Sequence, residues 1–227
     1  MKRNRACLLT AAALLFALPA FADGGARYEI EITNLTKGQT FTPILVTTHA
    51  SGVRLFELGE PASEALEILA EAGDTGPMSD ALNAQGRSVG DVVTIPGLLG
   101  PGETARAEIR ATGRARHLSL AAMLIPTNDT FFAIDGVRLP KWRDRFTGLA
   151  YDAGTEANDQ SCRNIPGPRC NGEGHSPEPG DGDEGHVYVG NGFHELGDAD
   201  AAEAEVLEPL PYDWRNPVAL VTVRRLR

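Results

Sequence analysis

The sequence predicts an all-β protein, an antiparallel β-sandwich with a short helical insert and a disulfide-bearing acidic loop. Three observations support this class. Apolar and polar residues alternate in several short runs, Gly and Pro turns separate these runs, and one stretch changes to helical spacing. Strands that follow one another without regular intervening helices are typical of sandwiches rather than of α/β folds.

The N-terminal residues 1–22 are predicted to be a signal peptide and not part of the fold. Three basic residues precede an apolar run, residues 8–18, which is too short to span a bilayer. Ala20-Phe21-Ala22 ends in the small residues that a signal peptidase recognises, so we expect cleavage before Asp23. An uncleaved anchor is the alternative. Residues 23–227 then suit a single domain that is secreted or periplasmic.

Two strands and a helical insert are expected next along the chain. Residues 28–32 alternate apolar with polar side chains, and residues 43–48 form an apolar, β-branched run. Residues 62–72 place apolar side chains at helical spacing with glutamates on the other face, and Gly73 is a suitable end for this helix. A second short helix is expected over 78–84.

The rest of the chain returns to the strand pattern, interrupted by one polar segment. Residues 171–185 contain Gly, Pro, Asp and Glu and almost nothing apolar, which predicts a mobile acidic loop. Further strands are expected at residues 92–95, 104–109, 118–124, 131–139 and 218–226.

Charge and cysteine content restrict the classes of partner. The net charge of −10 argues against nucleic-acid binding and against unaided adsorption to anionic lipid. Removal of the leader leaves two cysteines, Cys162 and Cys170, and an even pair in an exported chain predicts one disulfide. A zinc site on this pair is the alternative, but the sequence offers no convincing second pair of ligands.

Several segments, taken in order, resemble the spondin domain, the amino-terminal module of F-spondin and mindin that also occurs in bacterial secreted proteins. The resemblance covers most of the chain after the leader. The segments that carry it are Thr42–His49, Leu58–Glu64 with Ala70–Asp74, Pro126–Leu139, Tyr151–Glu156 and Asp213–Ala219.

This resemblance implies a sandwich of about eight strands, akin to calcium-dependent membrane-targeting domains, with a Ca²⁺ ion at one end and a role in matrix or cell-surface adhesion. Carried over residue by residue, the implied ligands are Asp129, Asp152 and Glu108. The backbone carbonyl of Ile134 is a further candidate. The reserve or supporting carboxylates are Asp135, Glu156 and Asp159.

The residue types agree with such a site. Calcium takes six to eight oxygen ligands, and Asp129 and Asp152 carry short carboxylates in turns that close apolar runs. Three carboxylates at one site repel one another without a cation, so the ion-free state should be loosened there. The alternative is that these aspartates cap turns through their own backbone, in a structural sandwich that holds no ion.

We therefore expect a non-enzymatic, secreted calcium-binding module whose partner is an unknown surface protein or glycan. No Gly-x-Ser-x-Gly elbow and no Gly-rich phosphate loop occurs in the sequence. The alternative function is an envelope metalloprotein or enzyme that holds a transition metal through His117, His186 and His194.

Overall fold

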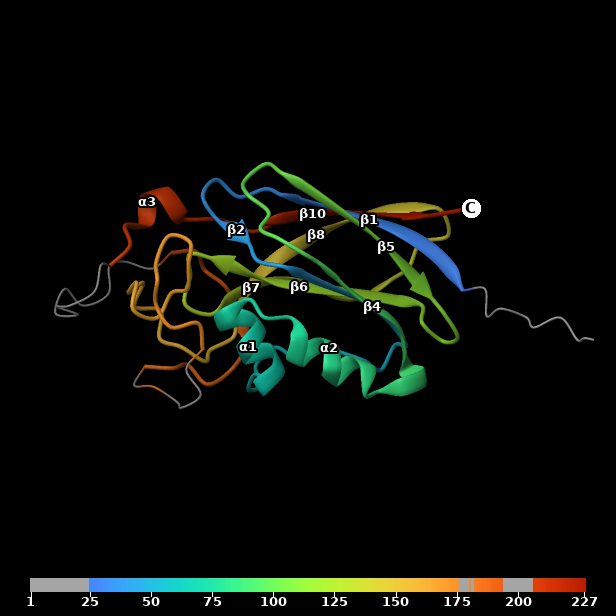
Figure 1. Ribbon diagram of the computed structural model, residues 1–227, viewed down its shortest axis with the longest axis horizontal. Helices are drawn as coiled ribbons and strands as arrows, with labels where there is room; N and C mark the ends of the chain where they lie inside the picture. The colour runs from blue at the N-terminus through green and yellow to red at the C-terminus, as the bar shows by residue number, and fades with distance from the viewer. Residues whose placement is uncertain (1–24, 176–179, 181, 194–205) are drawn as a thin grey trace, which may run out of the picture.

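The computed structural model describes residues 25–175, 180, 182–193 and 206–227 (Figure 1). The expected signal peptide lies outside these residues. Within the described part of the chain, no helix has both the length and the apolar character that crossing a membrane requires.

Strands are the main regular element of the described structure, and they pair antiparallel throughout. The strands are β1 (Ala26–Asn34), β2 (Thr40–Phe41), β3 (Ile44–His49), β4 (Val89–Ile95), β5 (Thr104–Ala111), β6 (His117–Ile125), β7 (Thr130–Arg138), β8 (Arg143–Asp152), β9 (Tyr188–Val189) and β10 (Ala219–Arg225). The helices are α1 (Glu64–Ala72), α2 (Gly76–Asn83), the 3₁₀-helix η1 (Gly86–Ser88) and α3 (Pro209–Tyr212). The all-β prediction with a short helical insert is therefore confirmed.

One sheet runs through the whole molecule and almost closes on itself. Its strand order is β4-β3-β6-β7-β8-β10-β1-β5, with β2 added to β6 and β9 added to β8. The two end strands, β4 and β5, lie near each other without a backbone ladder. Side chains bridge them instead: Asp91 Oδ2 accepts a hydrogen bond from Arg110 N at 2.9 Å, and Thr112 Oγ1 donates to Gly90 O at 3.1 Å.

The main core lies inside this curved sheet. β1 shows how the sequence builds it, because Tyr28, Ile30 and Ile32 alternate with polar residues and all three side chains are buried. Phe41 and Phe132 stack across the interior with ring centroids 4.2 Å apart. The alternation read from the sequence therefore identifies the buried face correctly.

The helical insert covers one outer face of the sheet and forms a second core there (Figure 1). Ser63 caps α1 by accepting a hydrogen bond from Leu66 N at 3.3 Å, and Gly73 ends the helix in the left-handed conformation, as its position predicted. The fully buried Leu66 and Leu69 pack in the same cluster as Phe131 of β7. The insert therefore fixes β7 from outside.

The strand β8 was not among the expected strands. Its first half exposes Arg143, Asp144 and Arg145, and Gly148 interrupts the second half, so neither half shows a clear period-two pattern. β8 forms because β7 and β10 pair with its two sides. Tertiary pairing here overrides a weak local signal.

Candidate metal centre

Two aspartates meet where β7 begins and β8 ends, which we call the Asp129 end of the molecule. Thr130 and Asp152 are directly paired residues of these antiparallel strands. Asp129 immediately precedes β7, and its backbone oxygen accepts a hydrogen bond from Ala153 N at 3.2 Å. Antiparallel pairing thus places two residues that are far apart in sequence side by side.

The carboxylate of Asp129 is fully buried and only half satisfied. Its Oδ2 accepts hydrogen bonds from the backbone amides of Thr155 at 2.7 Å and Glu156 at 3.1 Å. Its Oδ1 has no hydrogen-bond partner among the described residues. A buried carboxylate oxygen without a donor is costly, so it calls for a cation or a proton.

The carboxylate of Asp152 is 2% exposed and connects to a second layer of polar groups. Its Oδ1 accepts from Gly154 N at 3.0 Å, and its Oδ2 accepts from Asn158 Nδ2 at 3.0 Å. The same Asn158 amide also contacts Glu184 Oε1 at 3.3 Å and the Tyr188 hydroxyl at 3.0 Å. Asp152 is therefore linked to the segment that contains Glu184 and Tyr188.

Burial and mutual repulsion perturb these groups. Burial raises the pKa of Asp129 well above its usual value, and the charge of Asp152 raises it further, against the opposing effect of the two backbone hydrogen bonds. Burial also raises the pKa of Asp152, and the hydrogen bonds from Asn158 and Gly154 oppose this. Burial, followed by the charge of Asp152, raises the pKa of Tyr188. Full ionisation of the cluster is thus unfavourable without a positive charge.

A close backbone approach brings the third segment to the site. Gly154 has a φ of +69°, and a Cβ on it would lie 2.3 Å from the backbone oxygen of His186. Gly185 N also donates to Gly154 O at 2.8 Å. Glycine at 154 therefore allows the Glu184 segment to lie directly against the turn that follows Asp152.

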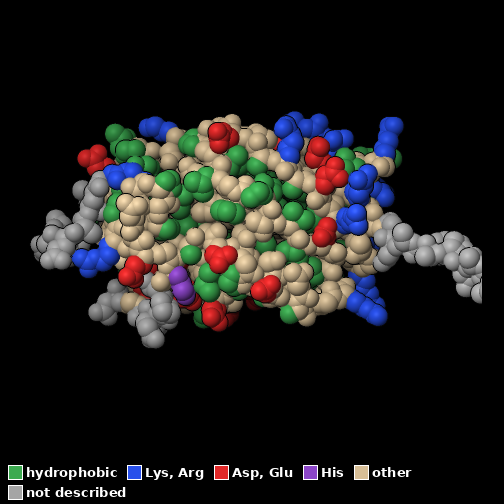
Figure 2. Space-filling model, in the orientation of Figure 1, with side chains coloured by type: hydrophobic (Ala, Val, Ile, Leu, Met, Phe, Trp, Pro, Cys, Tyr) green, Lys and Arg blue, Asp and Glu red, His purple; other side chains and the backbone are tan. Residues whose placement is uncertain are grey.

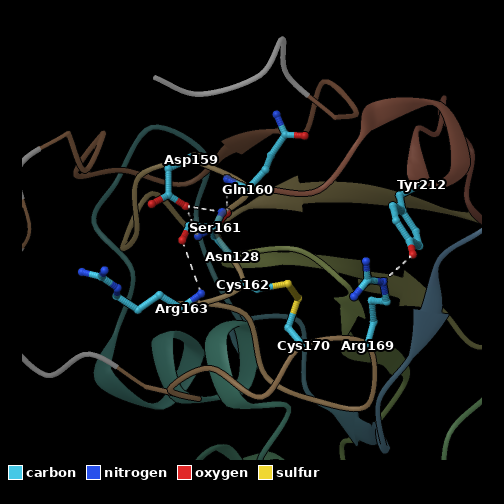
Figure 3. Close-up of a disulfide and its surroundings, with 9 residues drawn as sticks. All are labelled: Asn128, Asp159, Gln160, Ser161, Cys162, Arg163, Arg169, Cys170 and Tyr212. Atoms are coloured by element: carbon cyan, nitrogen blue, oxygen red, sulfur yellow. Dashed lines mark hydrogen bonds between the residues drawn. A yellow bond between two sulfur atoms is a disulfide. The ribbon is translucent and has the colours of Figure 1, made fainter. Parts of the chain in front are cut away.

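Residues close to the disulfide form hydrogen bonds with Asn128, the residue before Asp129 (Figure 3). The predicted bridge between Cys162 and Cys170 is present. Asn128 Nδ2 donates to Asp159 Oδ1 at 3.1 Å, and Asn128 Oδ1 accepts from Gln160 N at 3.2 Å. Asp159, a reserve ligand in the sequence analysis, thus supports the loop that carries Asp129.

The structure does not bring Glu108 to this site, which corrects the expected ligand set. Glu108 lies on β5 opposite Glu29, its side chain is exposed, and it contacts Arg27 Nη1 at 3.4 Å. Glu29 pairs in turn with Arg224 of β10, and Arg224 pairs with Arg143 of β8, so Glu108 lies level with Arg143 across the sheet. Arg143 lies nine residues before Asp152 on the same strand, which corresponds to about 30 Å.

Of the other reserve ligands, Glu156 also lies at the Asp129 end, whereas Asp135 and Ile134 do not. The Glu156 side chain is 6% exposed, and its charge adds to the repulsion on Asp129. Asp135 instead accepts from Ser119 Oγ at 2.7 Å and from Leu55 N at 3.2 Å. Ile134 lies within β7, paired with Leu120 and buried in the main core.

The histidines of the alternative function do not converge. His117 pairs with Arg138, at the end of β7 remote from Thr130, and its ring stacks on His49 at 6.1 Å. His186 lies beside Gly154, at the Asp129 end. His194 lies outside the described residues. The structure therefore separates His117 from His186.

The opposite end of the molecule has the other charge. A cavity of about 990 Å³ opens there, lined by the start of β1, the β5–β6 and β7–β8 turns and the end of β10. Its lining includes Arg116, Arg138, Lys141 and Arg225, with Asp144 as the acidic member. Figure 2 shows Lys and Arg side chains gathered toward this end on the visible face. Cations are repelled here and attracted at the Asp129 end.

Three residues of the Asp129 end were not found from the sequence: Asn158, Glu184 and Tyr188. Asn158 follows Asp152 by six residues, within a segment that has no helix or strand pattern. Glu184 lies in residues 171–185, which were predicted to be a mobile acidic loop, and Tyr188 follows this segment. The available signal was weak: the short apolar stretch Val187-Tyr188-Val189, which includes β9.

Comparisons with known proteins agree with the fold. A family model described as Spondin_N matches residues 33–162, more than half of the 227 residues. The matched region contains β3 to β8 and both aspartates of the site. A search of the curated proteins finds no match to this chain.

Proposed function

Because the chain belongs to the spondin family, we propose that it is a non-enzymatic, exported binding module that holds a Ca²⁺ ion at the Asp129 end. The family and the disulfide agree with an extracellular type of module. The calcium ion, the binding role and the absence of catalysis are the proposal.

One observation carries the calcium assignment: the buried Oδ1 of Asp129, which has no donor among the described residues. The other carboxylates whose charges act on Asp129 are those of Asp152 and Glu156. A set of hard oxygen ligands suits Ca²⁺ better than a transition metal. Asp129 Oδ1 and the Asp152 carboxylate would supply the negative charge, with Glu156 as a third carboxylate.

The proposed ion would act as a structural clamp. It would neutralise the repulsion between Asp129 and Asp152 and so hold together the turn at 152–156 and the segment at 184–188. Loops held in this way at one end of a rigid sheet form a typical surface for recognition. A surface protein or a glycan is the expected class of partner.

Calorimetry and thermal unfolding with and without Ca²⁺ test this function. We expect binding of one ion and stabilisation by about 2.7 kcal/mol when free Ca²⁺ reaches about 100 times the dissociation constant. For a domain of this size, that is a rise in melting temperature of roughly 5–10 °C.

The variant Asp129→Asn should lose most of the binding heat and of the thermal shift. Without calcium it should be at least as stable as the native chain at neutral pH, because it removes a buried charge. Glu108→Gln is the matched control and should respond to calcium as the native protein does. Equal calcium responses in Asp129→Asn and the native protein, or no response in either, would refute the proposal.

A further inference from the structure

A second group of metal-binding side chains lies away from the Asp129 pair, between α1 and the segment after the disulfide. Glu67 and Glu71 lie one turn apart on α1, and His175 approaches them from the loop. His175 Nδ1 lies 2.9 Å from Glu71 Oε2 and 3.8 Å from Glu67 Oε1. The three potential ligand atoms all lie within 4.8 Å of one another.

Burial distinguishes this group from an ordinary surface ion pair. The Glu71 side chain is 1% exposed, Glu67 is 23% exposed and His175 is 29% exposed. Carboxylates are rarely buried to this extent on the packed face of a helix unless they have a charged or metal partner. The opening toward solvent lies on the side of Glu67 and His175, so an ion can enter from there.

The loop holds His175 near the helix through contacts of its own. Gly172 N donates to Ile165 O at 3.0 Å, and Glu173 N donates to Arg163 O at 2.8 Å. A Cβ on Gly174 would lie 3.6 Å from the Cβ of Ala72, the last residue of α1. Two glutamates on a rigid helix thus face an imidazole whose neighbouring residues are fixed by hydrogen bonds.

We propose that Glu67, Glu71 and His175 form a second metal site, specific for Zn²⁺ or a divalent transition-metal ion of similar chemistry. One nitrogen and two carboxylate oxygens are a ligand set that zinc accepts, with water in the remaining position. Ligand atoms about 2.0–2.1 Å from a tetrahedral zinc are roughly 3.3 Å apart, a value between the two observed distances. The imidazole distinguishes this site from the oxygen-only Asp129 end.

Electrostatics within the group favour a cation. Burial raises the pKa of Glu67, the charge of Glu71 raises it further, and His175 opposes the shift. A protonated His175 would supply one positive charge to two carboxylates, whereas a divalent ion would supply two.

Zinc titration of the full chain by calorimetry tests the site, in the presence of saturating Ca²⁺ so that the Asp129 end does not contribute. We expect one Zn²⁺ per chain. Affinity should fall at least about 100-fold in His175→Ala and in Glu71→Gln. The matched controls are His186→Ala and Glu64→Gln, and Asp129→Asn should also retain zinc binding. Thermal unfolding of each variant verifies that it is folded.

Cobalt gives a readout that does not depend on heat. Co²⁺ bound through an imidazole and carboxylates should produce visible absorption bands that the native chain shows and His175→Ala lacks. If the native chain binds no Zn²⁺, or if His175→Ala binds it equally well, the site is overturned. A His175 that titrates as a protonated partner of Glu71 without taking up zinc would also overturn it, since the group would then be an ion pair only.

Discussion

At the scale of single residues, the two oxygens of Asp129 have different surroundings. Two backbone amides stabilise the ionised form at Oδ2. Oδ1 has no such donor within the described part of the chain, and the nearby charge of Asp152 destabilises the ionised form. Since burial and this repulsion dominate, the folded state without a cation binds a proton more tightly than the unfolded chain does.

Stability should therefore depend on pH in opposite ways with and without calcium. A carboxyl group whose pKa is raised on folding favours the folded state below its unfolded pKa, near 3.8, and this contribution is lost as the pH rises through the folded pKa. Calcium requires the ionised form, so protons and calcium compete.

We expect the calcium-induced rise in melting temperature to be largest near about pH 7.5 and to shrink steadily toward about pH 5. Scanning calorimetry at several pH values, with and without Ca²⁺, measures this difference. Asp129→Asn should show a much weaker pH dependence in the absence of calcium. A calcium effect of constant size over this range would contradict the assignment of the ligands.

The sequence predicted part of the candidate site, for reasons that can be stated residue by residue. Asp129 and Asp152 were implied as ligands by the resemblance to the spondin domain, and their positions in turns that close apolar runs agreed with that role. Glu108 also lies in a strand, but the sequence does not reveal how far along the sheet it lies from Asp129 and Asp152. Asn158 and Glu184 are brought in by loops, whose paths depend on contacts such as that of Gly154 with His186.

At the scale of secondary-structure elements, the strands and helices predicted from the sequence are those whose apolar residues recur at a clear strand or helix spacing. β1 alternates cleanly, and α1 has helical spacing, a Ser cap and a terminal Gly. β8 is exposed at its charged first half and was missed, because its pairing comes from β7 and β10 rather than from its own residues. The fold class did not depend on this strand, but the position of Asp152 at the end of β8 did.

The disulfide loop is an element whose role is tied to the site. Asp159 and Gln160, which hydrogen-bond to Asn128, lie just before this loop, and the segment that carries His175 follows it. Cys170 packs with Ile165 and Leu207 in a small core of its own. Loss of the bridge should therefore affect both proposed ion sites as well as stability.

Replacement of both Cys162 and Cys170 by Ser should lower the free energy of unfolding by about 2–3 kcal/mol, since the bridge closes a short loop. Denaturant titration in the presence and absence of a reductant measures this cost. Calcium affinity should also fall in the variant. Ser substitution of Cys7, which lies in the predicted leader, is the control and should leave the stability of the processed protein unchanged.

At the scale of the whole molecule, the two ends present different charged groups. Acidic groups lie buried at the start of β7 and the end of β8, and arginines and a lysine surround the cavity at the opposite end. The continuous sheet and its core separate the two ends. Ion binding at one end should therefore be a local event.

Hydrogen exchange should detect this locality. We expect Ca²⁺ to slow amide exchange in residues 152–156 and 184–188 by at least about tenfold, because the ion disfavours local opening there. The turns at 112–116 and 139–142, at the opposite end, serve as the internal control and should change little. Protection confined to those distant turns would place the ion elsewhere.

The bridged gap between β4 and β5 restricts how this protein can recognise other chains. The Asp91 carboxylate accepts a hydrogen bond from the Arg110 amide, and the Thr112 hydroxyl donates one to the Gly90 carbonyl. These two backbone groups are therefore not available to pair with an added strand. Recognition by β-augmentation, in which an extended peptide joins the sheet as a further strand, is therefore disfavoured. The same side chains also guard against templated fibril growth at this gap in the sheet.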